Sequence, residues 1–190
     1  IVTLEDPIEY ELQDIIQSQV DAEHGYTFAN GLRAILRHDP DIILVGEIRD
    51  YETAQTAIDA SLTGHLVFTT LHTNSAIEAI PRLLSMGVSP YTFAPALRCV
   101  LAQRLIRTIK PELRGTKVNP DDPSIYGGQA ALPELLVATS ALRDLILLQV
   151  PKSEMEEQAR KEGFKGMREW GEEFVKNGTT CIEEILRVTA

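Results

Sequence analysis

Membrane-spanning segments are the first feature that the sequence lacks. Its 190 residues contain no hydrophobic run that approaches the roughly 18 uninterrupted apolar residues of a transmembrane helix. The first four residues, IVTL, form a strand-like run without the basic segment or the small-residue cleavage site of a signal peptide. These absences exclude a helical membrane span within the sequence, and we expect a cytoplasmic protein.

Cysteine is also scarce, and Cys99 and Cys181 are its only occurrences. Two isolated cysteines exclude a disulfide framework and the four-ligand sets of structural zinc sites. Cys99 lies inside an apolar pattern of helical spacing, and Cys181 lies near an expected helix start. We therefore expect both thiols to be structural, and we expect no zinc.

Positive charge is in deficit, because 18 lysines and arginines stand against 28 acidic residues, for a formal net charge of −10. The sequence has neither a polybasic run nor a stripe of alternating aromatic and basic residues. This balance disfavours direct binding to nucleic acid or to an anionic membrane surface. A local cationic site is still compatible with it, because Arg33, Arg37 and Arg49 gather around the central segment, where they would meet a phosphate.

The first half of the sequence alternates strand patterns with helix patterns. We predict strands over residues 1–4, 17–20, 42–45 and 66–70, and helices over residues 28–37 and 51–62. Thr27 and Asp50 are suitable N-caps for the two helices, and Gly64 ends the second. The continuous apolar run at 42–45 is typical of a strand that helices cover on both faces. The predicted fold class is therefore α/β, with a mostly parallel sheet covered by helices.

The second half of the sequence has mostly helical patterns and one irregular segment. Ser75 and Glu78 form a capping box for a helix that ends at Gly87, although Pro81 interrupts its pattern. Further helices are predicted over residues 90–107, 138–148, 152–162 and 167–176, and from residue 182 onward. Three prolines and three glycines between residues 110 and 128 indicate a connector. We accordingly divide the chain into an α/β core at 1–110, a connector at 111–130 and a small all-helical C-terminal extension at 131–190.

The segment DPDIILVGEIRD, residues 39–50, carries the clearest chemical signal. Its apolar strand is followed by Gly46 and Glu47, so the strand delivers a single carboxylate to its tip. ATP hydrolysis needs magnesium on the phosphates, a carboxylate that positions the attacking water, and cations on the developing charge. A fixed and poorly hydrated carboxylate suits such chemistry. A second candidate is Glu9, which closes EDPIE after the first strand, where Pro7 stiffens the turn.

Histidines and arginines complete the set of candidate residues. His65 and His72 flank the strand LVFTTL, and arginine pairs bidentately with phosphate oxygens, so Arg33, Arg37 and Arg49 are the available cations. An ordinary structural interpretation competes at each position. Strand-end acids and histidines are often surface groups, and the arginines have acidic neighbours such as Asp39 and Asp50 with which to pair. The sequence does not decide which arginine serves a nucleotide and which serves a neighbouring subunit.

Three segments in this order and spacing resemble a known family. EDPIEY at 5–10, DPDIILVGEIRD at 39–50 and TGHLVFTTLHT at 63–73 are similar to the aspartate box, the atypical Walker B strand and the histidine box of the secretion ATPase superfamily. The resemblance is to the motors of type II secretion and type IV pilus assembly, and it implies a RecA-like core, ATP and magnesium. It also implies that Glu9 polarises the attacking water and that Glu47 holds magnesium, directly or through water. His72 would sense the γ-phosphate, and His65 would have a secondary role.

The sequence departs from the family at two places. It contains no G-x-x-x-x-G-K-[ST] motif, the loop that cradles phosphates. In the resembling family this loop lies shortly upstream of the aspartate box, so we expect the chain to be a fragment that by itself binds ATP weakly or not at all. Assembly motors also usually carry a four-cysteine zinc excursion after QRLIR, whereas residues 107–126 contain no cysteine. Retraction motors lack that excursion too, but the segments at 131–136 and 163–189 resemble the assembly and secretion branch.

The resemblance implies a motor subunit that hydrolyses ATP to drive assembly of a type II secretion pseudopilus or a type IV pilus. Its expected partners are further copies of itself in a hexameric ring, an inner-membrane platform protein and cytoplasmic recruitment proteins, which would place it peripherally at the inner membrane. One alternative is a retraction or conjugation ATPase of the same superfamily. Another is a non-hydrolysing ring or docking subunit. The negative charge disfavours a DNA translocase.

Overall fold

The computed structural model describes residues 1–189, and they form two compact units. The first unit comprises Ile1–His72, Ala79–Arg98 and Arg143–Val150. The second unit comprises Thr73–Glu78, Cys99–Leu142 and the residues from Pro151 onward. The chain therefore passes between the units several times, and each unit has its own sheet.

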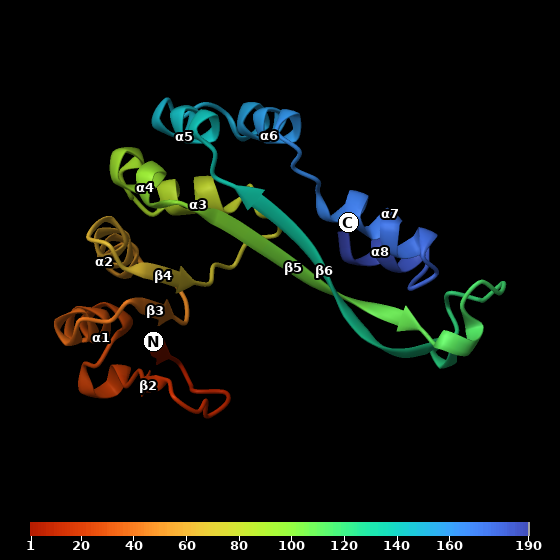
Figure 1. Cartoon of the computed structure of the whole chain (residues 1–190), viewed down its shortest axis with the longest axis horizontal. Coiled ribbons are helices and arrows are strands. Elements are labelled where there is room, and N and C mark those ends of the chain that lie inside the picture. Colours follow the sequence, from red (N-terminus) through yellow and green to blue (C-terminus); the bar gives the residue numbers. More distant parts are fainter. Residues whose placement is uncertain (190) are drawn as a thin grey trace. The chain divides into compact units, whose positions relative to one another are not determined.

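The first unit contains a parallel sheet of four strands (Figure 1). Its elements are β1 (Val2–Glu5), β2 (Ile16–Gln19), α1 (Phe28–Ile35), β3 (Ile42–Val45), α2 (Tyr51–Leu62), β4 (Leu66–Thr69), α3 (Ala79–Ser85) and α4 (Pro90–Ala96), with 3-10 turns at Ala22–His24 and Leu36–His38. The strand order is β2-β1-β3-β4, and all three pairs are parallel. The carboxyl ends of the strands therefore lie along one edge of the sheet.

Helices α1 and α2 of the first unit begin where the sequence predicts. The Thr27 hydroxyl accepts a hydrogen bond from the Asn30 amide, and the Asp50 carboxylate accepts one from the Thr53 amide, so both caps are confirmed. Gly31 lets α1 approach β1, because a Cβ at this position would lie 2.9 Å from the Leu4 side chain. The apolar strand β3 has the predicted bounds, and its Ile43 and Val45 are fully buried.

Strand β4 lies at one edge of this sheet, and helices do not cover it on both faces. Its Leu66 and Phe68 side chains remain about half exposed among the described residues. The predicted α/β class with a mostly parallel sheet is nevertheless confirmed for this unit.

The helix predicted over residues 90–107 is wrong. Helix α4 ends at Ala96, and Cys99–Ile109 form strand β5, which pairs antiparallel with β6 (Tyr126–Val137). Leu97, Leu101 and Leu105 suggested a helix because they recur every four residues, but four is also an even number, so Leu101 and Leu105 share one face of a strand equally well. Long-range pairing with residues 126–137 decides the outcome. Cys99 consequently lies in a strand, and it is exposed.

The capping box predicted at Ser75 and Glu78 is also wrong. Helix α3 begins only at Ala79, so Pro81 lies in its first turn, where the missing amide hydrogen has no helical partner to lose. The Glu78 carboxylate accepts a hydrogen bond from the Asn74 amide at 3.2 Å instead.

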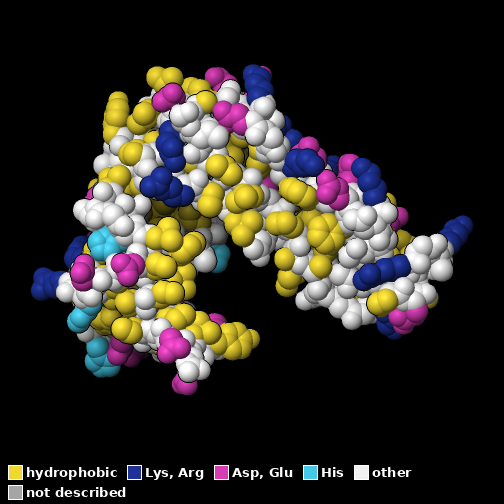
Figure 2. Space-filling view, viewed as in Figure 1, with side chains coloured by type: hydrophobic (Ala, Val, Ile, Leu, Met, Phe, Trp, Pro, Cys, Tyr) yellow, Lys and Arg dark blue, Asp and Glu magenta, His cyan; other side chains and the backbone are white. Residues whose placement is uncertain are grey.

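The second unit is built on the ribbon of β5 and β6. Its helices include α6 (Lys152–Lys161), α7 (Met167–Lys176) and α8 (Ile182–Thr189); α5 (Ser140–Leu147) lies where the chain passes to the first unit, and 3-10 turns occupy Pro111–Leu113 and Pro123–Ile125 in the expected connector. One face of the ribbon packs against α7 and α8 around a core of Ile106, Leu132, Met167 and Ile185. On the other face Leu101, Leu105, Leu135 and Val137 are about half exposed, and hydrophobic side chains gather over the ribbon in Figure 2.

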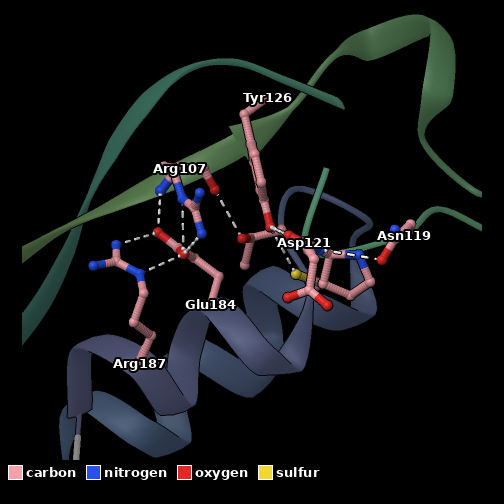
Figure 3. A network of polar contacts seen from close by, with 9 residues as sticks. Arg107, Asn119, Asp121, Tyr126, Glu184 and Arg187 are labelled. Atoms are coloured by element: carbon pink, nitrogen blue, oxygen red, sulfur yellow. Dashed lines mark hydrogen bonds and ion pairs between the residues drawn. The ribbon is translucent and has the colours of Figure 1, made fainter. Parts of the chain in front are cut away.

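A buried carboxylate joins α8 to β5 (Figure 3). Glu184 accepts hydrogen bonds from the Arg107 amide and guanidinium at 2.7–3.0 Å and from the Arg187 guanidinium at 2.7 and 2.8 Å. The Arg107 guanidinium also lies over the Tyr126 ring, 4.1 Å from its centroid. The hydrogen bonds from Arg187 and Arg107 outweigh the effect of burial and lower the pKa of Glu184 to about 2, so this carboxylate is ionised.

The helices predicted in the C-terminal part are present as α5 to α8, but the segment at 131–190 is not helical throughout, because β6 extends to Val137. The division into a core at 1–110, a connector at 111–130 and an extension at 131–190 stays a prediction. The two compact units of the structure have other boundaries. No helix within residues 1–189 is both long enough and apolar enough to cross a membrane.

Candidate active site

The candidate site is centred on Glu47, which follows β3 at the carboxyl edge of the parallel sheet. The preceding Gly46 donates its amide hydrogen to the Leu4 carbonyl of β1 at 2.8 Å. A Cβ at Gly46 would lie 3.1 Å from that carbonyl oxygen, closer than most Cβ contacts. Glycine is therefore the residue that permits this approach, and it fixes one side of the backbone that carries Glu47.

Thr70 fixes the other side of the same backbone. Its hydroxyl donates a hydrogen bond to the Gly46 carbonyl at 2.6 Å, and its carbonyl accepts one from the Ile48 amide at 3.1 Å. The backbone on both sides of Glu47 is thus tied to the chain just after β4. Sequence patterns give little sign of this role, because threonine is common in strands.

Two side chains contact the Glu47 carboxylate. An Arg49 Nη2 atom donates to Oε1 at 2.5 Å, and His72 Nε2 lies 3.3 Å from Oε2, where it donates when Nε2 carries the proton. The Glu47 side chain is only 13% exposed, whereas Arg49 and His72 are 62% and 87% exposed. The structure therefore brings together three of the residues that the sequence singled out.

The charge on Glu47 follows from these contacts. The hydrogen bond from Arg49 lowers the pKa of the Glu47 carboxyl below its ordinary value, and the Arg49 charge and His72 act in the same direction against the opposing effect of burial. The hydrogen bond and charge of Glu47 raise the pKa of Arg49 in turn, with a further contribution from Asp6. Glu47 is therefore an anion whose two carboxylate oxygens contact exposed side chains.

His65 is not near this carboxylate. It precedes β4 at the opposite end of the strand, where its Nδ1 lies 2.9 Å from the Ala60 carbonyl and 3.3 Å from the Thr63 hydroxyl. These contacts close the carboxyl end of α2. The structure thus separates the two histidines by the length of β4, about 13 Å for four extended residues.

Arg33 and Arg37 also lie apart from Glu47. Arg33, on α1, donates to Glu52 of α2 and to the Asn30 side chain, so its acidic partner is neither Asp39 nor Asp50. Arg37 is exposed in the 3-10 turn Leu36–His38 and forms no ion pair with another residue in the described part of the chain. Both remain candidate cations for a ligand or a neighbouring subunit, and nothing in this chain assigns either one.

Glu9 lies in the loop between β1 and β2. It is exposed, and within residues 1–189 its side chain forms no hydrogen bond. The carboxylate is therefore free to meet a water molecule or a ligand, and its position depends on how firmly the loop is held.

The chemistry of the available donors decides which metal fits. Residues 1–189 contain no group of three His, Cys, Asp or Glu side chains arranged to hold a metal ion. Glu47 supplies a single carboxylate at the sheet edge. This matches magnesium, which is usually held by one or two carboxylates together with substrate phosphates and water. It does not match a structural zinc site, which requires four protein ligands.

A parallel sheet with a clamped carboxylate at its carboxyl edge is typical of α/β proteins that bind ligands there, and the likeness to solved motor ATPases identifies the architecture as RecA-like. The chain belongs to the family described as "Type II/IV secretion system protein", whose model matches residues 1–187. Sequence similarity alone had indicated this family, and the match extends well beyond the three motifs.

Similar proteins include type II secretion system proteins and type IV pilus ATPases. The type II secretion system protein HxcR of Pseudomonas aeruginosa is 47% identical over the whole chain, and the type IV pilus assembly ATPase PilB of Thermus thermophilus is 42% identical over 98% of it. The chain covers 42% of the former and 24% of the latter. Among solved structures, the pilus retraction motor PilT with bound ADP has a TM-score of 0.78 and 33% identity, over 99% of this chain and 52% of that one.

Proposed function

We propose that the chain is the part of a secretion ATPase that positions the catalytic carboxylates, within a motor that hydrolyses ATP to assemble a type II secretion pseudopilus or a type IV pilus. The observation that carries the proposal is the Glu47 carboxylate, clamped at the sheet edge through Gly46 and Thr70 and contacted by Arg49 and His72. Nucleotide hydrolases need a fixed carboxylate beside groups that can stabilise the charge that develops on the phosphate.

Each residue has a distinct role in this proposal. Glu47 would hold magnesium directly or through a water, and bound magnesium would offset the charge of the nucleotide phosphates. His72 and Arg49 are exposed groups already on the carboxylate, so both can turn toward phosphate oxygens when a nucleotide binds. Glu9 would accept a proton from, and orient, the attacking water.

We assign this activity to the complete protein, and the chain spans about 42% of the length of the type II secretion relatives that it matches. The phosphate-cradling motif is absent from these 190 residues. We propose that the motor acts as a hexameric ring, with an inner-membrane platform protein and cytoplasmic recruitment proteins as partners. The higher identity to HxcR, 47% against 33% for PilT, favours the secretion branch over retraction.

The test is magnesium-dependent ATP hydrolysis by the full-length protein and by its Glu9→Gln variant. We expect turnover in the wild type and a loss of at least about hundredfold in kcat in the variant, as for removal of a general base. Glu11→Gln is the matched control, because Glu11 is an exposed acid in the same loop, and it should retain activity. A folded wild-type protein without turnover would instead support a non-hydrolysing ring subunit.

A further inference from the structure

The loop that carries Glu9 runs from residue 6 to residue 15 and contains no helix or strand. A loop of this length without regular structure has many accessible conformations, so its order must come from contacts outside itself. Most of its side chains are exposed, including Tyr10 at 80% and Leu12 at 50%. Apolar packing therefore contributes little to its order, and polar contacts to its backbone become decisive.

Gln17 of β2 supplies two of those contacts and a third hydrogen bond to β1. Its Oε1 accepts a hydrogen bond from the Leu12 amide at 2.7 Å, and its Nε2 donates to the Tyr10 carbonyl at 3.0 Å. The same Nε2 donates to the Glu5 carboxylate at 2.9 Å. One amide side chain thus uses its acceptor and both of its donor hydrogens, and it joins the middle of the loop to the end of β1.

Gln19 holds the same loop nearer its start. Its Oε1 accepts a hydrogen bond from the Ile8 amide at 3.2 Å, directly before Glu9. Together the two glutamines bind the backbone of Ile8, Tyr10 and Leu12, so the residues on both sides of Glu9 are fixed from one strand.

Strand β2, at the edge of the sheet, links these contacts to β1. It pairs with β1 in parallel, with Thr3 opposite Gln17 and Glu5 opposite Gln19. The Thr3 hydroxyl donates to the same Glu5 oxygen that receives Gln17, so the carboxylate is held from both strands. The Glu5 backbone adjoins Gly46, whose Cβ position would lie 3.4 Å from the Glu5 Cα. The contacts through Glu5 therefore connect the loop to the backbone that carries Glu47.

We propose that Gln17, assisted by Gln19, is a positioning residue that fixes the Glu9 loop relative to the Glu47 edge of the sheet. This inference rests on the proposed function, because it gives Gln17 a role only if Glu9 acts on the attacking water. Gln17 touches no reacting atom, and it acts through the loop backbone. Misplacement of a catalytic group by about 1 Å can reduce a rate by roughly 10²-fold, so such a device affects kcat strongly.

Gln17→Glu is the most informative substitution, because it keeps the size and shape of the side chain. One carboxylate oxygen can still accept from the Leu12 amide, but the other would face the Glu5 carboxylate and the Tyr10 carbonyl, both acceptors, at about 3 Å. The loop would then detach from its base. Gln13→Glu is the matched control, because Gln13 lies in the same loop and its side chain has no hydrogen bond to another residue in 1–189.

The experiment measures ATP turnover by the full-length wild type and by the Gln17→Glu, Gln13→Glu and Glu9→Gln variants, together with amide hydrogen exchange at Ile8 and Leu12. We expect Gln17→Glu to lower kcat about tenfold to hundredfold with KM for ATP unchanged within about twofold. Exchange at both amides should become faster in this variant, while Gln13→Glu leaves kcat and exchange as in the wild type. A loss of fold would instead change KM and the exchange of β1 and β3 as well.

The outcomes separate this inference from the function on which it rests. If Glu9→Gln abolishes turnover and Gln17→Glu leaves kcat unchanged, the positioning role is wrong and the proposed function stands. If the wild type turns over ATP and Glu9→Gln has no effect, the role of Glu9 is wrong and the positioning role falls with it.

Discussion

At the scale of single residues, the candidate site depends on how the Glu47 carboxylate is held. Gly46 and Thr70 fix its backbone, and Arg49 and His72 occupy its two oxygens. The sequence indicated Glu47 because it follows an apolar strand. It indicated Arg49 as one of three cations around the same segment, and His72 from its place after the next strand. It could not indicate the Thr70 clamp or the Gln17 contacts, because these depend on segments that meet only in the folded chain.

The Arg49 contact leads to a prediction about pH. Because Arg49 lowers the pKa of Glu47, Arg49→Ala should raise that pKa toward its ordinary value. Glu47 must be ionised for magnesium, so the acid limb of the kcat profile of the full-length protein should move to higher pH. Arg33→Ala serves as the control, because Arg33 pairs with Glu52 and should leave the acid limb in place. An unmoved acid limb in Arg49→Ala would contradict the assignment.

Glu184 gives a second prediction, for stability. Its folded-state pKa of about 2 lies below the ordinary value of 4.5, so its contribution is fully present above about pH 4.5 and is lost as pH falls toward 2. The shift corresponds to at most about 3.5 kcal/mol. Glu184→Gln should therefore destabilise the protein to chemical denaturation at pH 7 and flatten the loss of stability between pH 4.5 and 2. Glu183→Gln, an exposed neighbour on α8, should change neither quantity.

At the scale of elements, apolar runs and helix caps predicted most of the first unit, including the bounds of β3 and the start of α2 at Asp50. They failed at β5, where four-residue spacing fits a helix and a strand face alike. They also failed at α3, because a local capping box cannot reveal that residues 73–78 are held by a distant carboxylate. That carboxylate is Glu134, which accepts hydrogen bonds from the Ala76 amide at 2.6 Å and from the Met167 amide at 2.9 Å.

Glu134 carries a prediction at this scale. The side chain is 5% exposed and joins the Thr73–Glu78 segment to the start of α7. Glu134→Ala would leave two buried amides without an acceptor, and each such loss costs about 1–3 kcal/mol. We expect a decrease of about 2–5 kcal/mol in the free energy of unfolding, measured by denaturant titration. Glu172→Gln, at an exposed position of α7, should remain within about 0.5 kcal/mol of the wild type.

At the scale of the whole molecule, the first unit ends its main segment at His72, the residue that contacts Glu47, and the next residue belongs to the second unit. The candidate site therefore lies within one unit, and the chain leaves it directly for the other. The three motifs of the sequence suggest a motor. These 190 residues do not contain the phosphate-cradling motif, and a single chain does not show what a neighbouring subunit contributes. Activity is accordingly predicted for the full-length protein.

The most direct test of the central claim is the effect of Glu47→Gln on magnesium-dependent ATP turnover by the full-length protein, with Glu52→Gln as the control. Both are acids that follow β3, but Glu52 is exposed and pairs with Arg33 on the helices. We expect Glu47→Gln to lower kcat by at least about hundredfold and Glu52→Gln to retain turnover within about threefold. Equal turnover in the wild type and in Glu47→Gln would show that Glu47 is not the catalytic carboxylate.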